Sequence, residues 1–305
     1  FPRRRAGFDW SGIVPGDTSA TAWDGYVPFD SIPQVIDPAS GFLMNANNTP
    51  FRATDAASDL RRADYPAWMG IEPQMTNRAV RGLELLSAMP RITRDSLLRV
   101  KYDATYSMQS WMGTRLRAAL AMDTTGDARA ARAVRLLAGW DGALGDDRPA
   151  SAMGTVIALD WLRAKYGHYP APPAEESVRR GAKELERTFG RLDVPLSEYV
   201  RLRRGTLDLA LGNGGGDVLR AVYSTRQRDG RREATTGDSF VMLVEWAADG
   251  TLRAESIQPF GNALGRPRSR HYADQAALFV ARQRKVAPFT EAEQRAMLER
   301  EYRVP

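Results

Sequence analysis

The chain has 305 residues, of which 43% are hydrophobic and 26% are charged, and its formal net charge is +6. This composition is typical of a folded globular protein, and a chain of this length can bury a large core. The sequence contains no cysteine, which excludes disulfides, thiolate metal sites and a cysteine nucleophile within these residues. No uninterrupted apolar run of about 18 residues occurs, so no membrane-spanning helix is predicted.

The basic charge leaves two interpretations open. A contiguous arginine face would make the chain a basic, non-catalytic binding module for nucleic acid or an anionic surface. The arginines are, however, scattered along the sequence and interleaved with acidic residues. An arginine-biased composition explains the charge at least as well, so we expect no nucleic-acid or membrane partner.

We predict short strands, turns and loops over residues 1–75, because proline, glycine and aromatic residues are frequent there. A turn is expected at residues 37–41, where Asp-Pro is followed by Ser-Gly. The apolar run at residues 42–44 then predicts a short buried strand, which leads to Asn45, Asn47 and Asn48. These asparagines are either turn residues or, at the end of a buried strand, donors for a developing oxyanion.

Residues 76–194 form a predicted helical segment, because apolar residues recur there at helical spacing. Thr76 or Asn77 and then Thr93 are expected to cap its first two helices. The predicted helices cover residues 78–87, the stretch after Thr93, and residues 107–122, 127–140, 151–166 and 175–192.

Residues 195–305 are predicted to return to β-structure and to end in two helices. The apolar stretch 240–246 and the stretch 252–257 flank Asp249-Gly250, which is typical of a hairpin. Helices are expected over residues 273–282 and 290–302, the second with a capping box formed by Thr290 and Glu293. The fold class expected for the whole chain is therefore α+β.

Several weak motifs follow one another in order through nearly the whole chain. The central one, at residues 37–50, reads Pro-x-Ser-Gly, an apolar stretch, and Asn-x-Asn-Asn-x-Pro. The others lie at residues 23–29, 32–34, 201–205, 214–220, 237–239 and 271–275. In this order they resemble the β-chain of the penicillin acylase family of N-terminal nucleophile hydrolases, with the greatest similarity to acyl-homoserine-lactone and aculeacin-type acylases.

The resemblance implies a fold and an activity. The fold would be the C-terminal part of an αββα sandwich with a helical middle segment. The activity would be hydrolysis of a linear amide in a small N-acylated substrate, with no cofactor. An N-acyl-homoserine lactone or a related lipidated amide is the first expected substrate, and a penicillin-type amide is the second. The resemblance also implies a bacterial periplasmic or secreted location.

In the family, a serine at the β-chain N-terminus attacks the amide and its own α-amine serves as the base. This sequence starts with Phe1, so the nucleophile is expected to lie outside it. We expect the chain to be a piece of a longer precursor and to be inactive alone. Its expected partners are the remaining α-chain and the N-terminal β-chain segments of that precursor.

Two site residues follow from the resemblance. Asn47 matches the family's oxyanion asparagine, and Arg78 matches an arginine that supports it. Asn45 and Asn48 are expected to be strand-end and turn partners. Without the resemblance, Arg78 would be interpreted as a surface arginine on the first turn of a helix.

His271 and Asp274 suggest a different catalytic arrangement, a triad with Ser269 or Ser239 as the nucleophile. The sequence has no Gly-x-Ser-x-Gly elbow, and the resembled family does not use this histidine chemically. We therefore expect a structural role for His271.

No metal ligand is predicted. Asp59 can be aligned with a calcium-binding aspartate of the family only across a difference in length, and the metal is left out. Residues 123–127 lack the later ligand positions of a calcium loop. Two histidines, His168 and His271, do not make a zinc site without cysteines. The glycines of residues 212–217 predict a bend between strands, because the Gly-Lys-Ser/Thr of a phosphate loop is absent.

Overall fold

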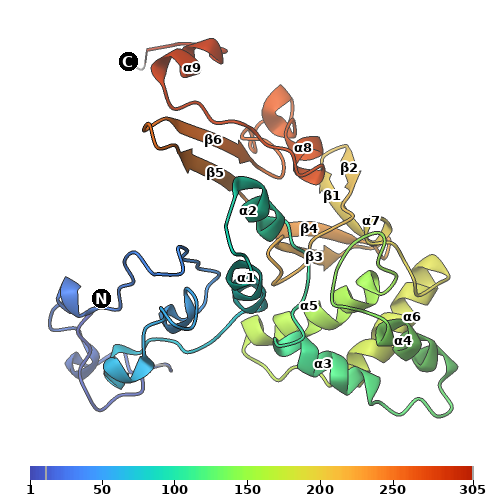
Figure 1. The fold of residues 1–305 in the computed structure, drawn as a ribbon. Coiled ribbons are helices and arrows are strands. Elements are labelled where there is room, and N and C mark those ends of the chain that lie inside the picture. Colours follow the sequence, from blue (N-terminus) through green and yellow to red (C-terminus); the bar gives the residue numbers. More distant parts are fainter. Residues whose placement is uncertain (11, 304–305) are drawn as a thin grey trace.

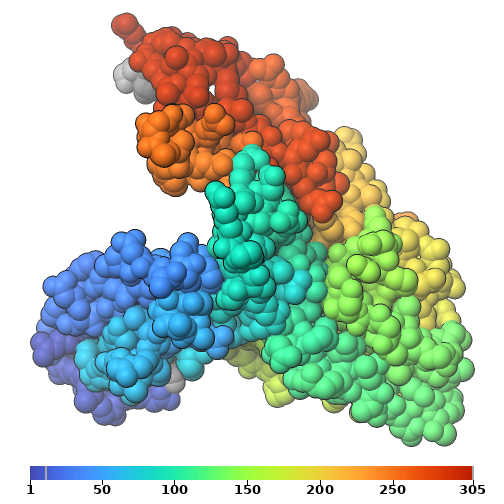
Figure 2. All heavy atoms as spheres, viewed as in Figure 1, coloured from blue at the N-terminus to red at the C-terminus, as the bar shows by residue number. Residues whose placement is uncertain are grey.

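Three segments of the chain meet at helix α1 (Asn77–Ser87) in the computed structural model, which describes residues 1–10 and 12–303. The N-terminal segment lies on one side of α1, the helices of residues 111–189 lie on the opposite side, and the C-terminal sheet lies beyond α2 (Arg94–Lys101) (Figure 1). The space-filling view shows an open hollow between the N-terminal segment, in blue, and the C-terminal segment, in orange and red (Figure 2). Helix α1 thus lies between the N-terminal segment and the rest of the chain (Figure 1).

The N-terminal segment forms turns and short 3-10 helices around a small core of its own. Phe51, Met69 and Ile71 are buried together in that core. The short helices are η1 (Ser19–Thr21), η2 (Phe29–Ser31), η3 (Pro50–Arg52), η4 (Arg62–Asp64) and η5 (Ala67–Met69).

The buried strand predicted at residues 42–44 does not form, and this prediction was wrong. Leu43 is 52% exposed. The Met44 amide donates to the Ala53 carbonyl at 2.8 Å, but no ladder continues on either side in the described part of the chain. An apolar run becomes a strand only where a neighbouring strand pairs with its backbone groups, and residues 1–10 and 12–76 supply none here.

The helical segment follows the predicted order, because its helices begin at the expected caps. The Thr76 hydroxyl accepts from the Ala79 amide at the start of α1, and Thr93 forms a capping box with Ser96 at the start of α2. The remaining helices of this segment are α3 (Trp111–Leu120), α4 (Ala128–Ala138), α5 (Ser151–Gly167) and α6 (Ala174–Phe189), and the short α7 (Leu196–Tyr199) follows it.

Helix α5 is the centre of the main core. It packs against α6 and α4, and Met153, Ile157 and Leu162 are almost completely buried. Gly154 allows the Trp140 ring to pack against α5, because a Cβ at this position would overlap with that ring. The nearly apolar sequence of α5 therefore reflects burial around most of the helix rather than on one face.

The strands form two sheets after residue 199. The first has the order β2-β1-β4-β3, in which β1 and β4 are parallel and the outer pairs are antiparallel. The second has the order β5-β6-β7, and its β5–β6 pair is the predicted hairpin, with Val244 opposite Ala254. The strands are β1 (Val200–Arg204), β2 (Leu207–Ala210), β3 (Val222–Arg226), β4 (Arg232–Gly237), β5 (Val241–Trp246), β6 (Leu252–Ile257) and β7 (Lys285–Val286). The α+β class is confirmed.

The terminal helices are shorter than predicted. Helix η6 (Arg270–Tyr272) precedes α8 (Ala276–Val280), and α9 (Glu291–Ala296) starts at the predicted Thr290–Glu293 capping box. Helix α9 has no buried residue, so packing does not extend it beyond its cap. Among the described residues, no helix has both the length and the apolar character needed to cross a membrane.

Candidate active site

Asn47 lies at the tip of a turn that its two neighbouring asparagines hold. Its φ of 60° is in the left-handed region, which asparagine adopts more readily than most residues. The Asn45 Oδ1 accepts from the Asn47 amide at 2.8 Å, and the Asn48 Oδ1 accepts from the Ala46 amide at 2.7 Å. Asn45 and Asn48 therefore fix the backbone of the turn, while the side chain of Asn47 is exposed.

This turn is attached to the N-terminus of α1. The Thr76 hydroxyl donates to the Ala46 carbonyl at 2.8 Å and also accepts from the Ala79 amide. The Asn48 Nδ2 donates to the Arg52 carbonyl at 2.6 Å. The residue that caps the helix thus also sets the position of Asn47 relative to the helix.

Arg78 is the link between α1 and the Asn47 side chain. Its Nη2 donates to the Asn47 Oδ1 at 2.8 Å. A guanidinium has only donors, so the oxygen of the Asn47 amide must face Arg78 and the NH₂ group must face away. None of the described residues accepts from that NH₂ group, which leaves it available to a bound molecule.

Asp217 holds Arg78 from the other side, and sequence reasoning did not identify it. Its side chain is only 1% exposed, and its Oδ1 accepts from the Arg78 Nε at 3.2 Å. Its Oδ2 accepts from the Asn77 amide and from the Trp111 Nε1, each at 2.8 Å. The signal that could have found Asp217 is its position directly after three glycines.

The glycines before Asp217 allow this close packing. A Cβ on Gly216 would lie 2.7 Å from Leu162 and 3.2 Å from the Tyr223 ring. The loop connects β2 to β3, so the predicted bend between strands is confirmed.

An aromatic group surrounds the same loop. The Trp111 ring stacks on the Trp161 ring at a centroid distance of 4.1 Å, and the Tyr106 hydroxyl donates to the Gly216 carbonyl at 2.7 Å. Burial raises the pKa of the Tyr106 hydroxyl, and burial together with a hydrogen bond between the Tyr166 and Tyr223 hydroxyls raises the pKa of Tyr223. Both phenols therefore stay neutral at physiological pH and act as donors or packing groups.

His271 lies between two carboxylates and does not form the alternative triad. Its Nδ1 is 2.7 Å from Asp274 Oδ2, and its Nε2 is 2.8 Å from Glu299 Oε2. The Ser269 hydroxyl instead accepts from the His271 backbone amide at 3.1 Å, as the N-cap of η6. The ring contacts carboxylates on both sides, which suits the expected structural role.

We expect the His271 contacts to weaken as the pH rises. Hydrogen bonds to Asp274 and then to Glu299 raise the pKa of His271 above its ordinary value of about 6.5. The stability that they provide is complete below that value and is lost as the pH rises through the folded pKa. Hydrogen bonds from Arg270 and then His271 lower the pKa of Glu299, so its contribution is lost in acid.

The measurement is hydrogen exchange of residues 290–303 across the pH range, after correction for the intrinsic exchange rate. Protection should fall above the folded pKa of His271, and the His271→Gln variant should lose this pH dependence. An unchanged profile in the variant would contradict the prediction.

The acidic positions considered for metals contact protein groups instead. Asp59 Oδ1 accepts from the Ala53 and Thr54 amides at 2.9 and 3.1 Å, and its Oδ2 lies 3.4 Å from the Arg52 Nε. Asp127 caps α4 and pairs with Arg179. Within the described ranges, no group of three or more His, Cys, Asp or Glu side chains is arranged to hold a metal ion.

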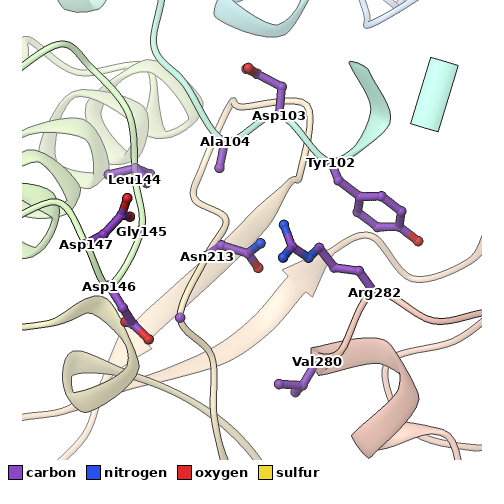
Figure 3. A pocket seen from close by; sticks show the side chains of 11 residues that line it. Tyr102, Asp103, Ala104, Leu144, Gly145, Asp146, Asp147, Asn213, Val280 and Arg282 are labelled. Atoms are coloured by element: carbon purple, nitrogen blue, oxygen red, sulfur yellow. The ribbon is translucent and has the colours of Figure 1, made fainter. Parts of the chain in front are cut away.

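Two clefts lie outside the Asn47 contacts. One, of about 510 Å³, is lined by acidic residues, including Asp146 and Asp147, and by Arg282 (Figure 3). The other, of about 520 Å³, runs along α1 and is lined by Arg52, the residue whose carbonyl binds Asn48, and by apolar residues such as Leu83. Neither cleft is lined by Asn47, Arg78 or Asp217, so the candidate site is not one of these clefts.

Known proteins resemble the chain in sequence and in fold. It is 31% identical to penicillin G acylase of Escherichia coli over 175 residues, which cover 53% of this chain and 18% of that protein. It is 38% identical to the acyl-homoserine lactone acylase PvdQ of Pseudomonas fluorescens over 79 residues, which cover 26% of this chain and 10% of that protein. The matched segments therefore span less than a fifth of these relatives.

The solved structure of a thermostable penicillin G acylase from Alcaligenes faecalis shares the fold. It matches with a TM-score of 0.54 and 15% sequence identity, and the match covers all of this chain and 64% of the other. The model of the family described as penicillin amidase matches residues 1–296. This chain therefore belongs to the penicillin amidase family.

Proposed function

We propose that the chain supplies the oxyanion-stabilising part of an amide hydrolase site. The observation that carries this proposal is the hydrogen bond from Arg78 to the Asn47 Oδ1, because it turns the Asn47 NH₂ group outward. A fixed donor aimed at developing negative charge stabilises a tetrahedral intermediate without having to reorganise during the reaction.

The proposed reaction is acyl transfer in two steps. The hydroxyl of an N-terminal serine, which the family resemblance places outside residues 1–305, attacks the amide carbonyl while its α-amine takes the proton. The carbonyl oxygen becomes an oxyanion, to which the Asn47 Nδ2 donates. The amine then leaves with a proton, and water hydrolyses the acyl-enzyme. The partners are the remaining segments of the same precursor.

The proposed substrate is a small N-acylated molecule. An N-acyl-homoserine lactone is the first choice and a penicillin-type amide is the second, and the names of the two relatives agree with one choice each. Assays of the full-length protein on a series of N-acyl-homoserine lactones and on a chromogenic phenylacetyl amide test this order. We expect the higher kcat/KM on a lactone, and a higher value on the phenylacetyl amide would reverse the order.

The surface charge gives less support to a basic binding module. Many arginines are paired with carboxylates: Arg129 and Arg132 share Glu186, and Arg201 and Arg203 share Asp208. Pairing of this kind reduces the free positive charge that would attract phosphates. We propose a periplasmic or secreted location on the family resemblance alone.

A further inference from the structure

Both the burial and the backbone conformation of Asp217 are energetically unfavourable. Asp217 is 1% exposed and has a φ of 60°, a left-handed conformation that is uncommon for a residue with a side chain. Burying a carboxylate is unfavourable unless charged and polar groups satisfy it. Residues held in sparsely populated backbone conformations cluster at functional sites.

The groups around Asp217 fix the carboxylate in one orientation. The Asn77 amide and the Trp111 indole nitrogen both donate to Oδ2, so Oδ1 is the oxygen that faces Arg78. The Asn77 side chain also donates to the Asp217 carbonyl at 2.7 Å. Because the carboxylate lies at the N-terminus of α1, the helix dipole further stabilises its negative charge.

The fixed carboxylate in turn determines which nitrogen of Arg78 reaches Asn47. With the Nε bound to Asp217, the guanidinium plane is set and its Nη2 points to the Asn47 Oδ1 at 2.8 Å. Arginine suits this role because its donors are held in one rigid, planar group. Asn47, Arg78 and Asp217 belong to the N-terminal, helical and C-terminal segments respectively, so tertiary packing brings the three together.

We infer that Asp217 is a positioning residue for the oxyanion donor, acting through Arg78 on the orientation of the Asn47 amide. This inference rests on the proposed function of Asn47. The inference predicts that Asp217 and Asn47 are energetically coupled, although no hydrogen bond joins their side chains directly.

A double-mutant cycle in the full-length enzyme tests the inference. Asp217→Asn keeps the size of the side chain but weakens its hold on the guanidinium, and we expect kcat to fall by about 10–100-fold, as when a reacting group is slightly misplaced. KM should change little, because the oxyanion exists only in the transition state. In the Asn47→Ala background the same substitution should cost less than about threefold, because the donor that it positions is already gone.

The outcomes separate this inference from the proposed function. If Asn47→Ala alone leaves kcat intact, the proposed function fails. If Asn47→Ala lowers kcat but Asp217→Asn causes the same fold loss in that background as in the unmodified enzyme, only the positioning role is overturned. The same holds if Asp217→Asn folds and keeps full turnover.

Two further variants keep the test decisive. Asp238→Asn is the matched control, because Asp238 is a carboxylate with 11% side-chain exposure that binds Lys101 at 2.8 Å, away from the Asn47 contacts. It should lower stability and leave kcat unchanged. If Asp217→Asn does not fold, Trp111→Phe removes one donor to Oδ2 and should lower kcat by about 3–10-fold, the size of one hydrogen bond. That loss should also vanish in the Asn47→Ala background, and an undiminished loss there would contradict the inference.

Discussion

Replacing Asn47 with alanine in the full-length enzyme is expected to lower kcat by about 10²–10³, the effect of losing one oxyanion donor. The physical reason is geometric: Arg78 holds the amide oxygen, so the NH₂ group faces away from the protein contacts. KM should stay nearly constant, since this donor meets a charge that develops only in the transition state. Steady-state kinetics on the purified variant and on the unmodified enzyme provide the measurement.

Two neighbouring substitutions serve as controls for this result. Asn47→Asp keeps an oxygen for Arg78 but replaces the donor, so its loss of kcat should be at least as large as that of the alanine variant. Asn48→Ala removes a contact that holds the turn. It should cost roughly 1 kcal/mol of stability and much less turnover. Unaltered kcat in both Asn47 variants would show that Asn47 is only a turn residue.

Replacing Arg78 with alanine should lower both stability and turnover. The substitution leaves the carboxylate of Asp217, whose side chain is 1% exposed, without its cation. Removing one partner of a buried ion pair typically costs about 3–5 kcal/mol. The Asn47 amide also loses the contact that orients it, so kcat should fall as well. Denaturant unfolding and steady-state kinetics measure the two effects separately.

A second substitution separates the two effects of Arg78. In the Arg78→Ala/Asp217→Asn double variant the buried charge is gone, so part of the lost stability should return while turnover stays low. Arg78→Lys should also recover stability better than turnover, because an ammonium group does not present two donors in one plane. If the double variant regained full turnover, Arg78 would have no role in orienting Asn47.

Most of the helices and one hairpin were predictable because their signals are local. Thr76, Thr93 and Thr290 cap helices within three or four residues of their own positions. The Asp249-Gly250 turn joins two strands that pair directly with each other. The resemblance selected Asn47 and Arg78, and the structure joins them by a hydrogen bond.

The predictions that were wrong or incomplete depended on distant parts of the chain. The apolar run at residues 42–44 has strand-like composition, but a strand also needs a partner, which the sequence pattern does not specify. Helix α9 ends well before residue 302 because nothing buries its continuation.

The sequence by itself thus determined the α+β class and the capped helices, and its resemblance to a known family selected the asparagine and arginine of the candidate site. Only the tertiary structure decided which oxygen or nitrogen each side chain presents. Asp217 lies 139 residues from Arg78 along the chain, yet its carboxylate fixes the guanidinium. Capping and periodicity act over a few residues, whereas the partners of a buried charge are chosen by packing of the whole fold.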